Sequence, residues 1–243
     1  MLQVALWVAR PKASVADEHG HLYIAKFPST RDDYDVGGWE MVVNALAVGC
    51  RLNVAAAEAH KFASDYHCFM VRRFDRTHTG QRLHFASAMT MTRHQDGDDA
   101  STGVSYLELA EVLIREGSQT NTDLKELWSR IVFNILVSNT DDHLRNHGFI
   151  MVPGRGWRLS EAYDINPAPW SDGLKLNITE SDNALDLELA REVAGYFRLS
   201  LAEADEIIEK FIGIVSQWRT IANRLELPLR EQERMAEAFK GAI

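Results

Sequence analysis

The 243-residue sequence has little of what marks secreted, membrane-spanning or nucleic-acid-binding proteins. It has only two cysteines, Cys50 and Cys68, too few for a disulfide framework, so we expect a reducing compartment, the cytoplasm. No apolar stretch reaches the roughly 18 residues that a membrane-spanning helix needs. The N-terminus has no basic segment before its apolar residues, which makes it a poor signal peptide. Internal repeats and low-complexity tracts are also absent from the sequence.

Positive charge is scarce as well. The chain has 26 Lys and Arg against 35 Asp and Glu, a formal net charge of −9. This balance argues against direct nucleic-acid binding through a broad basic face. The 46% hydrophobic content is ordinary for a globular protein, and the length suffices for one large domain or two lobes with a sizeable core.

Strand patterns crowd the first third of the chain, and helical patterns fill the rest. A hairpin with strands at residues 14–16 and 22–27 is predicted, and a further strand at residues 66–74. Residues 38–48 are expected to form a helix, and residues 90–103 a polar, mobile loop. Later helices are predicted over residues 106–116, 122–138, 183–197, 201–225 and 229–239, with a short hairpin over residues 148–152 and 156–159.

This order of elements predicts an α+β fold with two lobes. A strand-rich N-lobe is expected over residues 1–75 and a mostly helical C-lobe over residues 76–243, with the boundary within residues 75–105. The segment 122–138 is apolar on nearly all sides after Trp128, so we expect it to be the central core helix. A cleft between the two lobes would be a usual place for a ligand.

A dense run of polar residues follows that helix: residues 138–148 read S-N-T-D-D-H-L-R-N-H-G. Asp141 precedes Asn146 by five residues, the spacing of the kinase catalytic loop, where the Asp accepts the substrate hydroxyl proton and the Asn holds a metal ion. A loop of that length can turn both side chains toward one phosphoryl group. Asp164 follows the predicted hairpin and would be a second metal-binding acid. Oxygen ligands from Asn146 and Asp164 suit Mg²⁺.

Two residues of the first third fit the same chemistry. Lys26 would neutralise phosphate charge, and Glu40 would orient it as an ion pair. Each also has a simpler explanation: Lys26 as an edge-strand lysine that suppresses aggregation, and Glu40 as an acid at a helix N-terminus. A D-x-x-x-x-N match is weak by itself. The order of the elements is more specific, because it is hard to obtain by chance: a strand lysine, a helix acid, a buried helix, the Asp/Asn loop, a hairpin and a second acid.

The sequence resembles the HipA-type serine/threonine toxin kinases of bacteria. The resemblance is carried by N-T-D-D-H-L-R-N-H-G-F, Y-D-I-N-P, R-F-D-R and the A-R-P-K-A start, and it runs from Ala9 to at least Trp218. It implies a two-lobed protein-kinase-like fold, ATP and Mg²⁺ as cofactors, and phosphorylation of a serine or threonine. The protein substrate would be a translation component such as an aminoacyl-tRNA synthetase. A helix-turn-helix antitoxin is the implied partner.

The resemblance also implies roles for single residues. Asp141 matches the catalytic Asp, Asn146 the metal-binding Asn, and Asp164 the metal-binding acid of the family. Residues 72–74 match the hinge, whose backbone groups hydrogen-bond adenine. Nucleotide-binding positions are implied for Lys26, Arg72, Phe74, His143 and Tyr163.

Neighbouring residues are left with less defined roles. Asp142 and His147 are interpreted as supporting or family-variable residues, and Arg145 is expected to reach phosphate or substrate. Asp75 fits a structural salt bridge with Arg76 as well as a ribose contact.

Two features depart from the family pattern. The family has an additional N-terminal subdomain ahead of this region, which the sequence does not include, and a separate small protein could supply it. The family phosphate loop usually has glycine and serine where residues 5–12 read A-L-W-V-A-R-P-K, so an inhibitory autophosphorylation site has no counterpart there. These departures leave open a degenerate kinase fold that binds nucleotide or a partner without phosphotransfer.

A metal-dependent hydrolase is a third hypothesis. Its metal ligands would be Asp141, Asp142, His143 and His147. Adjacent residues cannot easily face one ion unless the loop is irregular, and no helical H-E-x-x-H pair supports this hypothesis.

Overall fold

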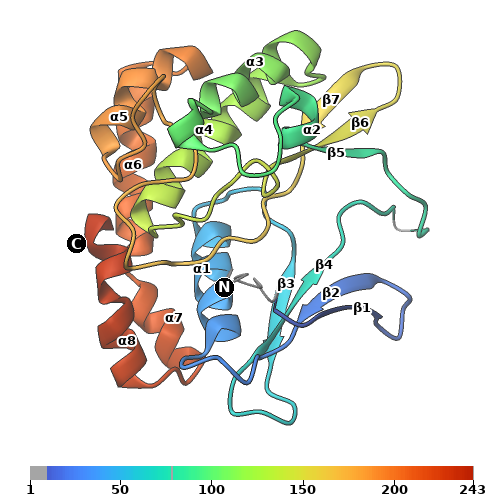
Figure 1. Ribbon diagram of the computed structural model, residues 1–243, viewed down its shortest axis with the longest axis vertical. Helices are drawn as coiled ribbons and strands as arrows, with labels where there is room; N and C mark the ends of the chain where they lie inside the picture. The colour runs from blue at the N-terminus through green and yellow to red at the C-terminus, as the bar shows by residue number, and fades with distance from the viewer. Residues whose placement is uncertain (1–9, 78, 243) are drawn as a thin grey trace, which may run out of the picture.

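The computed structural model describes residues 10–77 and 79–242 (Figure 1). The N-terminal part contains an antiparallel sheet with the strand order β1-β2-β4-β3. The predicted hairpin is present, and its turn uses Gly20 at φ +81°, a conformation that favours glycine. Strand β3 was not predicted, because its sequence A-E-A-H lacks the β-branched and aromatic residues typical of strands. The strands are β1 (Lys12–Ala16), β2 (Leu22–Lys26), β3 (Ala57–His60) and β4 (Cys68–Arg72).

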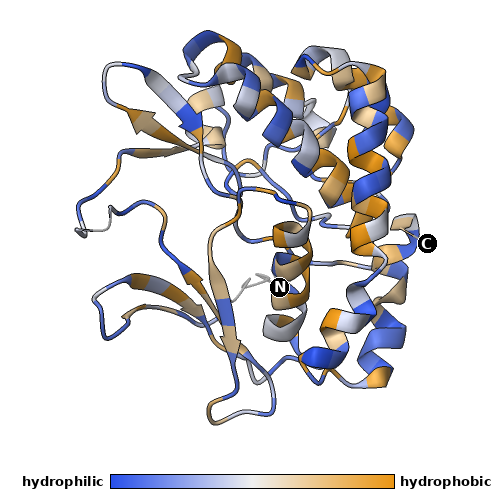
Figure 2. Cartoon of the chain, turned by 180° about the vertical axis from the view of Figure 1, so that it is seen from behind, coloured by the Kyte–Doolittle hydropathy of each residue, from blue (hydrophilic) through white to orange (hydrophobic). Residues whose placement is uncertain are grey.

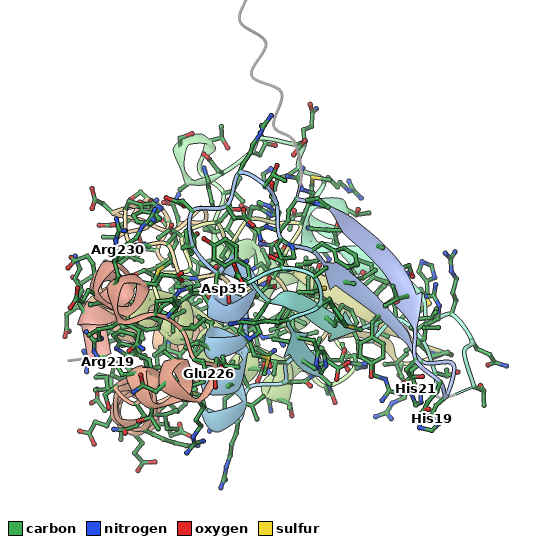
Figure 3. All side chains as sticks on the ribbon, turned by 90° about the horizontal axis from the view of Figure 1, so that it is seen from below. His19, His21, Asp35, Arg219, Glu226 and Arg230 are labelled. Carbon is green, nitrogen blue, oxygen red and sulfur yellow. The ribbon has the colours of Figure 1, made fainter. Side chains whose placement is uncertain are left out.

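Helix α1 (Val36–Gly49) packs against this sheet, as Figure 1 shows. Asp35 begins the helix, because its Oδ1 accepts hydrogen bonds from the backbone N–H of Gly38 and of His67, both at 2.9 Å. The same carboxylate therefore joins the start of α1 to the chain entering β4. Figure 3 shows Asp35 at the end of α1, far from His19 and His21 at the tip of the β1–β2 hairpin.

The hydrophobic core continues from α1 into the C-terminal helices. The Trp39 ring lies 5.8 Å from that of Trp218 and 6.3 Å from that of Phe239, and the latter two rings stack at 4.7 Å. Buried residues of α1 belong to the same core cluster as those of α4 and α6. The predicted boundary within residues 75–105 stays a prediction.

The C-terminal part combines a small sheet with most of the helices. Strands β5 (Phe85–Ser87), β6 (Gly148–Val152) and β7 (Gly156–Leu159) form this sheet in that order, and the β6–β7 hairpin is as predicted. Hydrophobic and hydrophilic residues alternate around the helices in Figure 2, as expected for helices with one buried face. These are α2 (Ala88–Thr92), α3 (Tyr106–Glu116), α4 (Thr120–Leu136), α5 (Leu187–Val193), α6 (Leu201–Val215), α7 (Trp218–Arg224) and α8 (Leu229–Met235).

Helix α4 is the core helix that the sequence predicted. Every residue from Leu127 to Leu136 is buried, including the polar Arg130 and Asn134. Helix α4 ends just before Ser138, which has a φ of +49°, and the chain then enters the polar run. The run therefore starts inside the protein, at the end of its most buried helix.

Several predicted boundaries were wrong. The segment 90–103 is not a single loop: α2 extends into it, and a 3-10 helix, Ala100–Thr102, lies near its end. The helix predicted over residues 201–225 breaks between α6 and α7, where the Ser216 hydroxyl donates to the Gly213 carbonyl at 2.9 Å. The break lets Trp218 reach Phe239. The helices predicted from residues 183 and 229 end as 3-10 helices, Ala194–Phe197 and Ala236–Ala242.

Two expectations from composition can be compared with the structure. Cys50 and Cys68 are both buried and free, so they form no disulfide. Among residues 10–77 and 79–242, no helix has the length and apolar character needed to cross a membrane.

Candidate active site

Lys26 lies between two carboxylates. Its Nζ donates to Asp164 Oδ1 at 2.6 Å and also to Glu40 Oε1. Strand β2 is an interior strand between β1 and β4, so the edge-strand explanation of Lys26 is wrong. The predicted pairing with Glu40 is present, and it reaches across from the sheet to the first turns of α1.

Burial and charge act against each other in this cluster. Burial lowers the pKa of Lys26, but the carboxylates of Glu40 and Asp164 outweigh it, so the pKa is raised and the ammonium stays charged. Burial raises the pKa of Asp164, yet Lys26 reverses the effect and the pKa falls below its ordinary value. Burial raises the pKa of Glu40 to about 7, against the opposing charge of Lys26.

A cavity of about 410 Å³ opens beside Lys26. Three aromatic rings meet there: Phe74 lies 5.3 Å from Tyr163 and 6.0 Å from Phe85 between ring centroids. The volume is that of a small-molecule site, and the lining combines aromatic and aliphatic side chains with charged ones. The lining residues are Lys12, Ile24, Lys26, Val71, Arg72, Arg73, Phe74, Asp75, Phe85, Tyr163 and Asp164.

The hinge that the resemblance implied borders this cavity. The backbone N–H of Arg72 donates to Ala56 O and that of Arg73 to Leu22 O, both at 2.8 Å, so neither is available to a ligand. Phe74 is the second residue past β4, and its N–H donates to no group within the described residues. Asp75 binds the guanidinium groups of Arg73 and Arg76, which supports its explanation as a structural salt bridge.

The two adjacent acids of the polar run face different surroundings. Asp141 is exposed, whereas Asp142 is 4% exposed. Asp142 Oδ2 accepts the Tyr106 hydroxyl at 2.6 Å and Asn134 Nδ2 at 2.8 Å, and His147 Nε2 lies 2.7 Å away. Asp142 therefore anchors the loop to α3 and α4, which leaves Asp141 as the acid that a substrate can reach.

Asn146 closes the loop that begins at Asp141. Its backbone N–H donates to His143 O at 2.8 Å, and its side-chain Nδ2 donates to Asp141 O at 3.1 Å. The amide nitrogen is thus used, and the amide oxygen is the group left for a metal ion. Together with the Asp164 carboxylate it supplies hard oxygen donors, which fit Mg²⁺ held jointly by protein and phosphate.

The metal-dependent hydrolase hypothesis is wrong. Among the residues that the structure describes, no three His, Cys, Asp or Glu side chains gather to hold a metal ion. His147 is turned inward and pairs with Asp142, so neither side chain is presented to an ion beside Asp141.

A second hollow of about 420 Å³ lies beside His143, Leu144 and Arg145, in the loop between Asp141 and Asn146. The structure places His143 here and not among the residues lining the first cavity, so its predicted nucleotide contact stays a prediction. Arg145 pairs with Asp96 in the second hollow. The Tyr163 hydroxyl donates to Arg145 O at 2.7 Å and so connects the first cavity to the loop.

Sequence patterns missed several residues of this site. Asn134, Asn139 and Asn166 link the Asp142 anchor to Asp164, and Lys12 lines the first cavity. The available signal was Asn134 itself, a lone amide in the apolar run I-V-F-N-I-L-V. The unusual phosphate-loop sequence falls mainly on residues 1–9, outside the described residues.

The comparisons with known proteins agree with this geometry. A model of the HipA-like C-terminal domain matches residues 9–219. The chain belongs to this family. The resemblance inferred from the motifs is therefore confirmed, over nearly the same range.

Curated relatives of this HipA-like chain cover parts of it. A Haemophilus influenzae protein named "Putative kinase" is 28% identical over 109 residues, 42% of this chain and 32% of that protein. "Putative kinase Y4mE" of Sinorhizobium fredii is 27% identical over 152 residues, 58% of this chain and 33% of that protein. The matched regions span about a third of these relatives' length.

Solved structures show the fold. HipA of Shewanella oneidensis, in a complex with HipB and its operator DNA, matches 99% of this chain and 63% of its own, with a TM-score of 0.75 and 18% identity. The proinflammatory kinase CtkA of Helicobacter pylori matches 88% of this chain and 94% of its own, with a TM-score of 0.56 and 11% identity. The predicted kinase-like fold, strand-rich in its N-terminal part and helical in its C-terminal part, is confirmed.

Proposed function

We propose that this HipA-like chain is an ATP- and Mg²⁺-dependent kinase that phosphorylates a serine or threonine of a protein. The observation that carries the proposal is Lys26, held by Glu40 and Asp164 at the charged end of an aromatic-lined cavity. A buried lysine between two acids is costly to maintain, and phosphate binding beside a metal-binding acid gives it a use.

Each side chain has one task in this proposal. Mg-ATP, when bound, supplies the phosphoryl group. Phe74 and Tyr163 pack against the base, and Lys26 neutralises phosphate oxygens. The Asn146 amide oxygen and the Asp164 carboxylate hold Mg²⁺. Asp141 accepts the proton of the acceptor hydroxyl, a task that its exposed position permits.

The acceptor protein would approach along the second hollow, next to Asp141. Asp96, Asp98 and Asp99 line this hollow together with Arg145 and Lys175. Its acids outnumber its bases, so we expect an acceptor segment with basic residues near the hydroxyl. A component of translation, such as an aminoacyl-tRNA synthetase, is the proposed substrate.

Partners are proposed by analogy. HipA of Shewanella oneidensis is in a complex with HipB and operator DNA, and a comparable antitoxin with a helix-turn-helix would bind and restrain this chain in the cytoplasm.

Thermal unfolding with and without Mg-ATP tests the nucleotide site. We expect the wild type to gain several degrees in Tm with Mg-ATP, and Asp164→Asn to lose the magnesium-dependent part of that gain.

Transfer of labelled phosphate to protein, with Asp141→Ala as the control, then tests catalysis. A stabilised wild type that transfers no phosphate would favour the degenerate binding module, which the sequence of residues 5–12 keeps as the second candidate. A wild type with no stabilisation would contradict both the kinase and a nucleotide-binding module, and would favour the degenerate fold that binds a partner.

A further inference from the structure

A chain of three asparagines, of which Asn134 and Asn139 are buried and Asn166 is half-buried, joins the proposed catalytic loop to the proposed metal-binding acid. On the loop side, Asn134 Nδ2 donates to the Asp142 carboxylate at 2.8 Å. Asn134 Oδ1 accepts from Asn139 Nδ2 at 3.1 Å. Asn139 Oδ1 in turn accepts the backbone N–H of Asn166 at 3.0 Å, and Asn166 Nδ2 donates to Asp164 Oδ1 at 3.3 Å.

Each end of this chain holds one part of the proposed site. Asp142 is adjacent to Asp141, and the Tyr106 hydroxyl and His147 also bind its carboxylate. The pKa of Tyr106 is raised well above its ordinary value by burial and by Asp142, so the hydroxyl keeps its proton and donates. Asp164 has a left-handed φ of +59°, which needs support from its surroundings.

Asn139 is the link between the two halves. It is 1% exposed, and its side chain uses its donor toward Asn134 and its acceptor toward Asn166. Asn139 lies between the buried Ser138 and Thr140, and an apolar side chain in its place would leave Asn134 Oδ1 and the Asn166 N–H without these partners. Asn134 and Asn139 in succession thus connect the loop to the segment of Asp164 from the interior, whereas the Tyr163 hydroxyl connects the same two segments from the side of the first cavity, through Arg145 O at 2.7 Å.

We propose that Asn139 is a positioning residue that fixes Asp164 relative to Asp141, acting through Asn134 and Asp142 on one side and Asn166 on the other. The inference rests on the proposed kinase function. If Asn139 is removed, the segment holding Asp164 loses its register against the loop that carries Asn146. The two metal-binding oxygens then no longer sit at one fixed separation. The aromatic cavity, which the amide chain does not line, keeps its shape.

The test compares magnesium requirements. Tm is followed at saturating non-hydrolysable ATP analogue while Mg²⁺ is titrated, for the wild type, Asn139→Leu and Tyr106→Phe. Asn139→Leu should raise the Mg²⁺ concentration for half-maximal stabilisation by about tenfold or more, as is usual when a side chain supporting a metal ligand is lost. Tyr106→Phe leaves Asp142 with two partners and should raise the Mg²⁺ concentration for half-maximal stabilisation by about threefold. Affinity for the analogue without Mg²⁺ should stay within about twofold of wild type.

Gln232→Met is the matched control. Gln232 is 3% exposed and donates twice, to Asn223 Oδ1 at 2.8 Å and to Leu227 O at 2.9 Å, so the change also removes two buried amide hydrogen bonds. It lies in α8, outside the amide chain. We expect a loss of Tm with an unchanged magnesium requirement.

A folded Asn139→Leu with a wild-type magnesium requirement overturns the inference, and so does an equal rise in Gln232→Met. If Asn139→Leu does not fold, Asn139→Ala decides, because it removes the same two hydrogen bonds without added bulk, and a wild-type magnesium requirement in that variant overturns the inference. No magnesium-dependent stabilisation in the wild type would instead refute the proposed function, which is a separate outcome.

Discussion

Two polar clusters with buried charged groups, one around Lys26 and one around Asp142, belong to the proposed site, and they are stabilised differently. Around Lys26, opposite charges pair directly, with two carboxylates on one ammonium. Around Asp142, a single carboxylate is held by a hydroxyl, an amide and an imidazole. A phosphate would compete with these two carboxylates for the Lys26 ammonium, whereas nothing has to leave Asp142. The first cluster can rearrange on binding, and the second holds the loop still.

The largest expected contrast is between the adjacent acids. Asp141→Asn should lower phosphotransfer by roughly a hundredfold to ten-thousandfold, because the acceptor proton loses its base, with Tm unchanged. Asp142→Asn should lower the free energy of unfolding by roughly 2–3 kcal/mol, because a neutral amide replaces an acceptor of charge-assisted hydrogen bonds. Chemical denaturation and phosphate-transfer assays on both variants measure the two effects.

The two acids act as controls for each other. If Asp141→Asn loses stability as Asp142→Asn does, the exposed acid is part of the anchor. If Asp142→Asn keeps full stability, the three contacts at its carboxylate do not hold the loop.

The second prediction breaks the charged cluster. Lys26→Met leaves Glu40 and Asp164 facing each other without a cation, and should cost about 3 kcal/mol of stability. It should also weaken binding of Mg-ATP. Calorimetric titration and denaturation check both effects. Lys12→Met, at an exposed lysine lining the same cavity, is the control and should change stability little. Equal effects of the two substitutions would contradict a special role for the buried lysine.

Sequence reasoning identified one of these clusters and missed the other. Lys26, Glu40 and Asp164 were predicted from their order along the chain and from the family resemblance, and the structure brings the three together. Within the anchor, Asp142 and His147 were interpreted as supporting or family-variable residues. Their partners Tyr106 and Asn134 were not predicted, because they come from α3 and α4, and nothing in a linear pattern says which helix faces will meet. The same limit applies to β3 and to the break before Trp218, where tertiary packing overrode local propensity.

The charged cluster makes the stability of the protein depend on pH through Glu40. Its folded-state pKa of about 7 lies above the usual 4.5, so the folded protein holds a proton that the unfolded chain releases. Stability should therefore fall as pH rises from about 4.5 to 7, and stay lower above that, by up to about 3 kcal/mol. Glu40→Gln removes this decline. Denaturation in metal-free buffer between pH 5 and 8 checks it, with Glu233→Gln at an exposed glutamate of α8 as control. A decline of equal slope in Glu40→Gln would assign it to another group.

The smallest expected effect separates the two ends of the first cavity. Phe74→Leu removes one ring from the aromatic contacts with Tyr163 and Phe85, and should weaken ATP binding by about 1 kcal/mol, roughly fivefold. Binding of inorganic triphosphate should not change, because Lys26 lies at the other, charged end. Phe62→Leu, at an exposed phenylalanine away from the cavity, should change the affinity for neither ligand.

If Phe74→Leu lowers the affinity for both ligands equally, the aromatic end supports the shape of the whole cavity. If it weakens ATP alone, the base is recognised by the rings and the phosphates by the charged cluster, so affinity and catalysis rest on different parts of the chain.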